Sequence, residues 1–444
     1  MIDDEGGSGY PGGVVAADGQ GVVPVPGHRS ARRGAVEGGV AFGVRLKVLR
    51  QSRGLTRETL GGLVGRSGSW VKAVEVGRLG VPKLHLLMAL ATALRVRDLS
   101  ELTGDQSLPV HLFAGPGHAR LPAVRAALDL YPLPPLAPDA AVPAPSALRA
   151  RLDAAWAARH AAANHREVIG ALLPDLIRDA QVAALVAGQA EERRAALAAL
   201  SQVYALAQFF LAYQSGASEL LWRAVERSLV AAQESGDARA IGVAAWLAAE
   251  AHRDAGHWEA ADAVTVATLD HLTPLLDAGG APVRAIYGAL QFEAGYTAAR
   301  SGRQGEAWGR WDAAAAVARS LPGDYYDPIT SFGQAVIGAH AVTVAVELRA
   351  GGEGVRQAVV SEGTAIPSRP RLARHRVEQA RAYQLAGQPD AAIATLALAA
   401  AAAPETVRYN GYAKGIVLEE TVSRSPARRR QAAELARSMG LLTS

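Results

Sequence analysis

The stretch GLTRETLGGLVGRSGSWVKAVEVGR, residues 54–78, has the pattern of two short helices joined by a tight turn. Gly65 allows the left-handed backbone that such a turn needs, and Ser67 can cap the second helix. On the second helix, Val71 and Val74 are three residues apart and share the face that points back at the first helix. The stretch therefore predicts a helix-turn-helix.

Amphipathic segments on both sides complete a small domain. A helix is expected from about Val40 to Ser52, ending at Gly54, and Pro82 suits the first turn of another helix that runs to Leu94. Asp98 can cap a short fifth helix over residues 99–102. We expect a five-helix domain over residues 39–104.

The combined spacing of these residues resembles the DNA-binding domain of the lambda/Cro-type repressors, also called the xenobiotic-response-element family. The residues that carry the resemblance are Leu49, Arg50, Gly54, Leu55, Thr56, Glu58, Leu60, Ser67, Ser69, Trp70, Val71, Val74, Glu75, Gly77, Arg78, Pro82, Leu90, Ala91, Ala93 and Leu94. In that family the positions matching Arg50 and Glu75 form an ion pair between the first helix and the recognition helix. The resemblance implies a structural role for both residues.

The resemblance also implies which residues meet DNA. The first residues of the recognition helix enter the major groove, and here they are Gly68, Ser69, Lys72 and Ala73. Gly68 and Ala73 stand where hydrogen-bonding residues are common, so base readout would depend on Ser69, Lys72, the leader or DNA shape. Phosphate contacts are expected from Arg57, Arg66 and Arg78, with Trp70 packed beside the backbone. Paired half-sites imply a homodimer on a double-stranded operator.

Composition supports a nucleic-acid partner and excludes other classes. Residues 40–104 contain 11 Lys or Arg against 4 Asp or Glu, although the whole chain of 444 residues carries only +4. The absence of cysteine excludes disulfides and thiolate zinc sites. Without a run of about 18 apolar residues or a signal peptide, we expect a cytoplasmic protein, on the nucleoid when bound to DNA, with no membrane partner.

Two regions outside this domain are expected to be irregular. Residues 1–38 are rich in glycine and read as a disordered leader. They include a G-x-G-x-x-G pattern at residues 7–12, but no strand precedes it, which argues against a dinucleotide-binding site. They also include a basic segment at residues 28–33, which is either a DNA-contacting arm or a flexible tail. Residues 105–145 are expected to hold a connector helix over 119–130 and then a proline-rich linker.

Residues 146–444 read as alanine-rich amphipathic helices that break at intervals. The breaks lie near Asn164, Gly216, Gly256, Gly302, Gly351 and Gly387. Three of them share a glycine followed by a helix start and an alanine, a theme typical of tetratricopeptide hairpins, and the region resembles degenerate repeats of that type. The predicted fold is all-α. Its domain arrangement resembles that of actinobacterial regulators and, in architecture alone, that of peptide-pheromone-sensing regulators.

Two helices of this region place aromatic and polar groups along one face. These are Trp246, Glu250 and Arg253 on one helix, and Tyr287 and Gln291 on the other. The concave face of stacked hairpins holds peptides or small ligands, so these residues mark a candidate pocket. Ordinary interhelical packing is the alternative for each of them.

The sequence shows little sign of chemistry. It contains no P-loop, no H-E-x-x-H and no G-x-S-x-G after a strand, and His252 and His257 do not share a helical face. We expect no enzyme activity, cofactor or metal. The prediction is a sequence-specific, dimeric DNA-binding transcriptional regulator whose helical-repeat domain senses a peptide or small molecule, mediates oligomerisation, or does both. The alternatives are a protein-interaction adaptor with a degenerate helix-turn-helix and an enzyme fused to a DNA-binding module.

Overall fold

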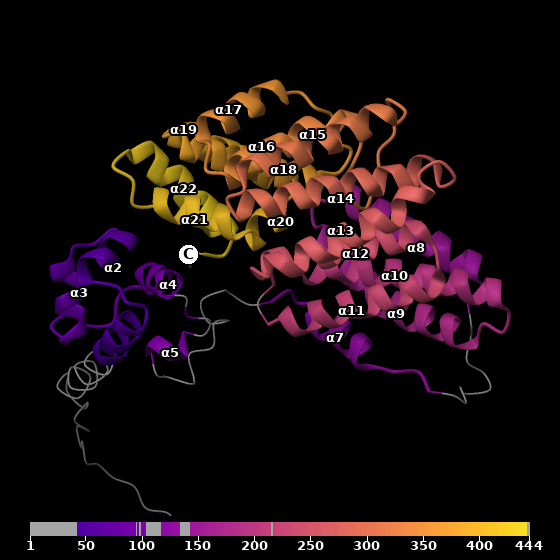
Figure 1. Ribbon diagram of the computed structural model, residues 1–444, viewed down its shortest axis with the longest axis horizontal. Helices are drawn as coiled ribbons and strands as arrows, with labels where there is room; N and C mark the ends of the chain where they lie inside the picture. Colours follow the sequence, from indigo (N-terminus) through magenta and orange to yellow (C-terminus); the bar gives the residue numbers. More distant parts are fainter. Residues whose placement is uncertain are drawn as a thin grey trace, which may run out of the picture. The chain divides into compact units, whose positions relative to one another are not determined.

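The computed structural model describes residues 42–94, 96, 99–103, 117–133, 143–214 and 216–441. The predictions for the leader, its glycine pattern, its basic segment and the Asp98 cap lie outside these residues. The chain divides into two compact units, unit 1 (residues 1–109) and unit 2 (residues 110–444). Within the described ranges the regular structure is helical, apart from an isolated antiparallel bridge between Asp327 and Phe332 (Figure 1), which confirms the all-α prediction.

Unit 1 has the five predicted helices around one small core. A helix over residues 42–52 is followed by α2 (Arg57–Leu63), α3 (Gly68–Glu75), α4 (Leu84–Ala93) and α5 (Ser100–Thr103). Their apolar faces bury Phe42, Leu46, Leu60 and Leu90 completely. Pro82 differs from its predicted place in the first turn of a helix. It precedes Lys83, the N-cap of α4, and so lies just outside the helix.

Unit 2 is a longer succession of helices. They are α7 (Leu121–Asp129), α8 (Pro145–Ala161), α9 (His165–Val186), α10 (Ala190–Leu211), α11 (Ser218–Ser235), α12 (Ala238–Asp254), α13 (Trp258–Leu272), α14 (Gly280–Arg300), α15 (Gln304–Ser320), α16 (Ile337–Glu347), α17 (Gly351–Val360), α18 (Arg369–Leu385), α19 (Pro389–Ala402), α20 (Pro404–Tyr409), α21 (Gly411–Glu420) and α22 (Pro426–Ser438), with 3-10 turns at Thr273–Leu275 and Gln334–Val336. The helix α7 falls where a connector was expected and contacts α9 and α11.

Consecutive helices of unit 2 pair as hairpins. Gly256, Gly302 and Gly387 form the turns of three of them with φ of 78°, 81° and 71°, a conformation that glycine adopts without strain. The break predicted near Gly351 lies directly before it, since α16 ends at Glu347 and α17 begins at Gly351. The left-handed residue of that turn is Arg349, with φ 57°.

The hairpins stack in two layers. The first helices of successive pairs, α10, α12, α14, α16 and α18, contact one another in that order and form an inner layer. Figure 1 shows α10, α12 and α14 lying side by side within unit 2. The second helices cover the outer side, as expected for stacked helical hairpins.

The two ends of unit 2 also meet. His160 on α8 lies 2.8 Å from the Ser368 hydroxyl at the start of α18, through its Nδ1 atom. Nε2 of His165 on α9 lies 3.0 Å from the Thr406 hydroxyl on α20. These contacts join residues that are 208 and 241 positions apart in sequence, so the stack closes around the space that its inner layer faces.

One described helix, α10, is long and apolar enough to cross a bilayer. In the part of it that meets this test, 83% is buried within unit 2. Most of its buried apolar residues, Tyr204 and Phe210 among them, belong to the largest core cluster. Burial of this extent is the packing expected of a central core helix.

Candidate functional site

The recognition helix α3 is fixed by its cap and its buried valines. The Ser67 hydroxyl accepts a hydrogen bond of 3.2 Å from the Trp70 backbone N–H and lies 2.9 Å from the Ser69 hydroxyl. Val71 and Val74 are 0% and 1% exposed, so they anchor one face of α3 in the core. The opposite face is left outside, as the helix-turn-helix arrangement requires.

The residues expected to read bases lie on this outer face. Ser69 and Lys72 are exposed, whereas Gly68 and Ala73 are half-buried. A Cβ atom at Gly68 would lie 2.7 Å from a carboxylate oxygen at the end of the exposed Glu58 side chain, which is free to move aside. Hydrogen-bond donors available to a base are therefore limited to Ser69 and Lys72 among these four residues.

Exposed cations lie at both ends of α3. Arg66 precedes its cap and Arg78 follows its last turn, and both side chains are exposed. The Arg66 guanidinium lies 6.0 Å from the centre of the half-buried Trp70 ring, within the range of a cation–π contact. Trp70 thus packs against the cation that would meet a phosphate.

A buried carboxylate ties α3 to the two preceding helices. Nε of Arg50 lies 2.6 Å from one oxygen of Glu75, and Nε of Arg57 lies 2.7 Å from the other. Arg57 was expected to contact phosphate, but its donor group is directed at Glu75 while its side chain stays 33% exposed. Burial raises the pKa of Glu75, but the hydrogen bonds from both arginines outweigh it and hold the pKa below its ordinary value.

Unit 2 contains a partly open cavity of about 230 Å³ on the side that its inner layer faces. Helices from both ends of the unit and from its middle contribute to the wall, because the stack closes on itself. The lining residues are Arg159, His165, Arg166, Gln208, Phe209, Ala212, Tyr213, Leu221, Trp246, Leu247, Glu250, Ala251, Arg253, Asp254, Phe292, Glu293, Tyr296, Ile329, Thr330, Ser331, Thr343, Pro370, Arg371, Arg374, Thr406 and Asn410.

Of the residues that the sequence marked as a candidate ligand pocket, those on α12 line this cavity and those on α14 do not. Trp246, Glu250 and Arg253 of α12 line it, but Tyr287 and Gln291 of α14 do not. Tyr287 packs against the core cluster, and the side-chain oxygen of Gln291 accepts a 3.0 Å hydrogen bond from Arg310 on α15.

The helix α14 presents a different face to the cavity. It contributes Phe292, Glu293 and Tyr296 to the wall. Every residue of α14 from 288 to 299 is buried, so its apolar pattern marks no single face. The sequence could show that α14 is a core helix but not which side meets the cavity.

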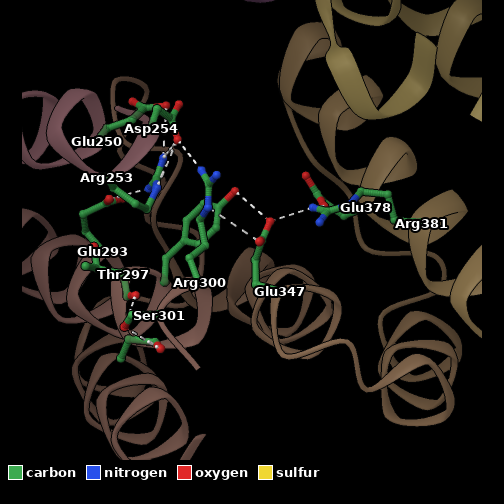
Figure 2. Close-up of polar contacts among 12 residues, drawn as sticks. Glu250, Arg253, Asp254, Glu293, Thr297, Arg300, Ser301, Glu347, Glu378 and Arg381 are labelled. Carbon is green, nitrogen blue, oxygen red and sulfur yellow. Dashed lines mark hydrogen bonds and ion pairs between the residues drawn. The ribbon is translucent and has the colours of Figure 1, made fainter. Parts of the chain in front are cut away.

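An ion-pair chain runs beside the cavity through four inner helices (Figure 2). Arg253 contacts Glu293 on α14 and lies 3.2 Å from Asp254. Asp254 in turn lies 2.8 Å from Arg300 on α14. This first half of the chain links α12 to α14.

The second half links α14 to α18. Arg300 lies 3.7 Å from Glu347 on α16, and Glu347 lies 2.7 Å from Arg381 on α18. Arg381 also lies 2.5 Å from Glu378, which pairs with Arg374 at 2.7 Å. Because Arg253 and Arg374 both line the cavity, the chain connects two of its walls.

Burial shifts the titration of several lining groups. It raises the pKa of Glu293 to about 8, because attraction to Arg253 only partly offsets the loss of water and the repulsion from Glu250 and Asp254. Burial lowers the pKa of Arg159 and of Arg166 to about 10, and Arg166 adds repulsion to the shift at Arg159. Burial also lowers the pKa of His165 to about 2, so its ring is neutral at pH 7.

Four lining arginines were not anticipated from the sequence: Arg159, Arg166, Arg371 and Arg374. Arg159 and Arg166 flank the predicted break at Asn164, and Arg371 and Arg374 share a face of α18 at i, i+3. The only signal was the recurrence of arginine in otherwise apolar helices. Among the described residues no group of three or more His, Cys, Asp or Glu could hold a metal ion.

Comparisons with known proteins identify the N-terminal domain. A family model described as a helix-turn-helix domain matches residues 41–103. No curated protein matches the chain. Among solved structures, the chain is similar to Bacillus thuringiensis PlcR in complex with the peptide PapR7 and DNA, at 12% identity and a TM-score of 0.26, over 80% of this chain and 99% of that one. A likeness at this TM-score does not transfer the partners of PlcR to this chain. The chain carries a helix-turn-helix domain followed by a closed stack of helical hairpins.

Proposed function

We propose that this protein is a sequence-specific DNA-binding transcriptional regulator whose unit 2 binds a ligand in its cavity. The observation that carries the proposal is the outer face of α3. Ser69 and Lys72 are exposed there, Val71 and Val74 anchor the opposite face in the core, and Glu75 in the last turn is held by two arginines. A helix anchored on one side and presenting donors on the other has the geometry for major-groove readout.

The cavity supports the second half of the proposal. A volume of about 230 Å³ with aromatic walls and several charged groups is the character expected of a small-ligand site, although it is smaller than the pockets that enclose drug-sized molecules. The ion-pair chain links α12, α14, α16 and α18, so a ligand that shifted one wall would act on the others.

Several finer features belong to the same proposal. We infer a homodimer on paired half-sites, a DNA-binding domain of the lambda/Cro type, degenerate tetratricopeptide-type hairpins and an actinobacterial, cytoplasmic, non-enzymatic regulator. Bases would be met by Ser69 and Lys72, and phosphates by Arg66 and Arg78. The adaptor alternative predicts that no DNA is bound.

The test is an electrophoretic shift assay of the full chain on its own promoter region at fixed low salt. Replacing Lys72 with alanine removes the long donor of the recognition helix, and we expect about a tenfold loss of affinity, since a good base contact contributes about 1–3 kcal/mol. The matched control is Lys83→Ala, which removes an exposed lysine that precedes α4 in the same domain. Equal binding by both variants would contradict the proposal that α3 lies in the major groove. Absence of binding by the unaltered chain would favour the adaptor alternative.

A further inference from the structure

Three arginines in the cavity wall have no carboxylate partner. Arg159 and Arg166 are 8% and 5% exposed, and Arg371 is half-buried. Within the part of the chain that the structure describes, none of the three guanidinium groups lies within ion-pair distance of an Asp or Glu. Burial of an unpaired charge is costly, so an arrangement of three needs a reason.

The contacts of their guanidinium groups are with uncharged groups, and the Glu405 carboxylate accepts a 2.6 Å hydrogen bond from the backbone N–H of Arg166. Arg159 lies 4.3 Å from the centre of the Phe209 ring, and Arg166 lies 4.9 Å from that of Tyr409. Nη2 of Arg371 donates to Nδ1 of His340 at 2.9 Å, where burial keeps the pKa of His340 well below its ordinary value and the ring neutral. These contacts hold the side chains in place without neutralising their charge.

The acidic residues of the same wall already contact other arginines. Glu250, Asp254 and Glu293 all contact Arg253, and Arg374 pairs with Glu378. The cavity therefore has two regions, one around Arg253, where acidic side chains already contact a cation, and one around Arg159, Arg166 and Arg371, where the cations lack such contacts.

Several lining residues also carry buried N–H groups that no atom of the described residues satisfies. Nε of Arg159, Nε of Arg166, Nε2 of Gln208 and Nε1 of Trp246 have no hydrogen-bond partner, and neither does Nδ1 of His165. A buried donor without a partner is uncommon in folded proteins. These donors are covered by neighbouring atoms and do not themselves face the cavity space, but together with the three arginines they make this side of the wall rich in donors.

The size and the remaining walls define the rest of the ligand. Phe209, Trp246 and Phe292 supply aromatic surface. An apolar cavity of about 150 Å³ holds a benzene ring, so about 230 Å³ suits one ring with a short acidic chain. A longer molecule, such as a peptide of several residues, could place only its terminal residue and carboxylate inside.

We infer that the cavity binds a small organic anion, a carboxylate or phosphate joined to an apolar ring, with its charge at Arg159, Arg166 and Arg371. The inference rests on the proposed ligand-binding role of unit 2 and adds the chemical class of the ligand. The same anionic group could belong to a carboxylic acid, a phosphate monoester or the C-terminus of a peptide, and the probes below separate these sources.

Isothermal titration calorimetry of the full chain tests the inference with matched probes. We expect 3-phenylpropionate to bind at least about tenfold more tightly than the neutral 3-phenylpropanamide, since hydrogen bonds to a charged group contribute about 1.5–3 kcal/mol. Comparison with 2-phenylethyl phosphate and with the dipeptide Ala-Phe assigns the source of the anion. Equal affinity for acid and amide, or no binding of any anionic probe at millimolar concentration, would overturn the inference.

Variants of similar side-chain volume test the arginines. Arg159→Met should reduce the affinity for the acid about tenfold, leave that for the amide unchanged and raise the melting temperature of the ligand-free protein, because an unpaired buried charge is removed. Arg151→Met is the control on the same helix, since Arg151 pairs with Asp179 at the surface, at 2.5 Å. If Arg159→Met lowers the melting temperature and affects both probes alike, Arg159 is structural and the inference fails.

A second variant and a parallel assay keep the result decisive. Should Arg159→Met fail to fold, Arg371→Met is expected to show the same acid-selective loss, and no selective loss there would overturn the inference. The shift assay on the same preparations distinguishes the two levels of the proposal. If the acid does not bind selectively but the chain still shifts DNA, the anion site is contradicted and the regulator proposal is not. If the acid binds but the chain shifts no DNA, the regulator proposal is contradicted and the anion site is not.

Discussion

Two buried glutamates of this protein have opposite surroundings. In unit 1, Glu75 is approached by two arginines, one on each carboxylate oxygen. In unit 2, Glu293 shares Arg253 with Glu250 and Asp254. Burial raises the pKa of both carboxylates, but two arginines outweigh it at Glu75 and lower the pKa there, whereas at Glu293 burial together with repulsion from Glu250 and Asp254 outweighs Arg253 and raises it.

The comparison distinguishes a site whose charged groups all have protein partners from a site in which some of them lack partners. Everything that positions α3 is supplied by the protein, so the recognition helix has its final shape before DNA arrives. The cavity instead leaves cations and N–H donors without partners on one side of its wall. A preorganised surface suits a partner of fixed shape, whereas unsatisfied groups in a cavity suit a ligand that supplies the missing charge.

Removing the carboxylate of Glu75 should give the largest effect. Glu75→Ala leaves Arg50 buried without its partner, and breaking a buried pair in this way costs about 3–5 kcal/mol. We expect the opening free energy of α3, measured by amide hydrogen exchange of the full chain, to fall by that amount. The control Glu58→Ala removes an exposed carboxylate and should cost under about 1 kcal/mol. Unchanged protection in Glu75→Ala would show that the ion pairs do not anchor α3.

The pH dependence of unit 2 should follow Glu293. Its pKa is about 8 in the folded protein against an ordinary value of 4.5, so between these values the folded state holds a proton that the unfolded state lacks. The stability of unit 2 should therefore fall as pH rises through this window, by up to about 1.4 kcal/mol per pH unit from this group. Glu75 has the opposite sign, since its stabilisation is present above pH 4.5 and is lost in acid.

The measurement is the urea unfolding of unit 2 at several pH values, compared with Glu293→Gln. The variant cannot ionise, so its stability should lose this part of the pH slope and should exceed that of the unaltered chain above pH 8. If both proteins show the same slope from pH 5 to 8, Glu293 is ionised throughout and the region around Arg253 is more polar than its burial indicates.

The sequence predicted unit 1 more fully than the cavity, and the reason is physical. Gly65, Ser67 and the paired valines are local signals, because a turn, a cap and a helical face are set by neighbours within a few residues. The cavity is made by contacts such as His160 with Ser368, which are distant in sequence. Trp246, Glu250 and Arg253 line the cavity and Tyr287 and Gln291 do not, although α12 and α14 are both buried on nearly all sides, so the pattern of either helix alone does not show which face meets the cavity.

The arginines of the cavity illustrate the same limit. In the sequence, Arg159 and Arg371 resemble the exposed arginines that are common on the polar face of amphipathic helices. Only the closure of the stack shows that both line one cavity without acidic partners. A surface arginine faces solvent and a buried one faces other side chains. Those side chains come from segments that are distant in sequence, so the sequence around the arginine does not show which case applies.

The smallest expected effect concerns Arg57, which the resemblance assigned to phosphate and the structure directs at Glu75. Because the Arg57 side chain is 33% exposed, its ion pair with Glu75 should contribute about 0.2–1 kcal/mol to the stability of α3. Arg57→Ala should then lower the opening free energy of α3 slightly and leave the salt dependence of DNA binding unchanged. Arg66→Ala should do the reverse, reducing the slope of log affinity against log salt by about one and leaving stability unchanged. A reduced slope in Arg57→Ala with intact stability would mean that Arg57 leaves Glu75 for a phosphate on binding. In that case Arg50 alone anchors the recognition helix in the complex, and unit 1 is less complete before DNA arrives than its ion pairs indicate.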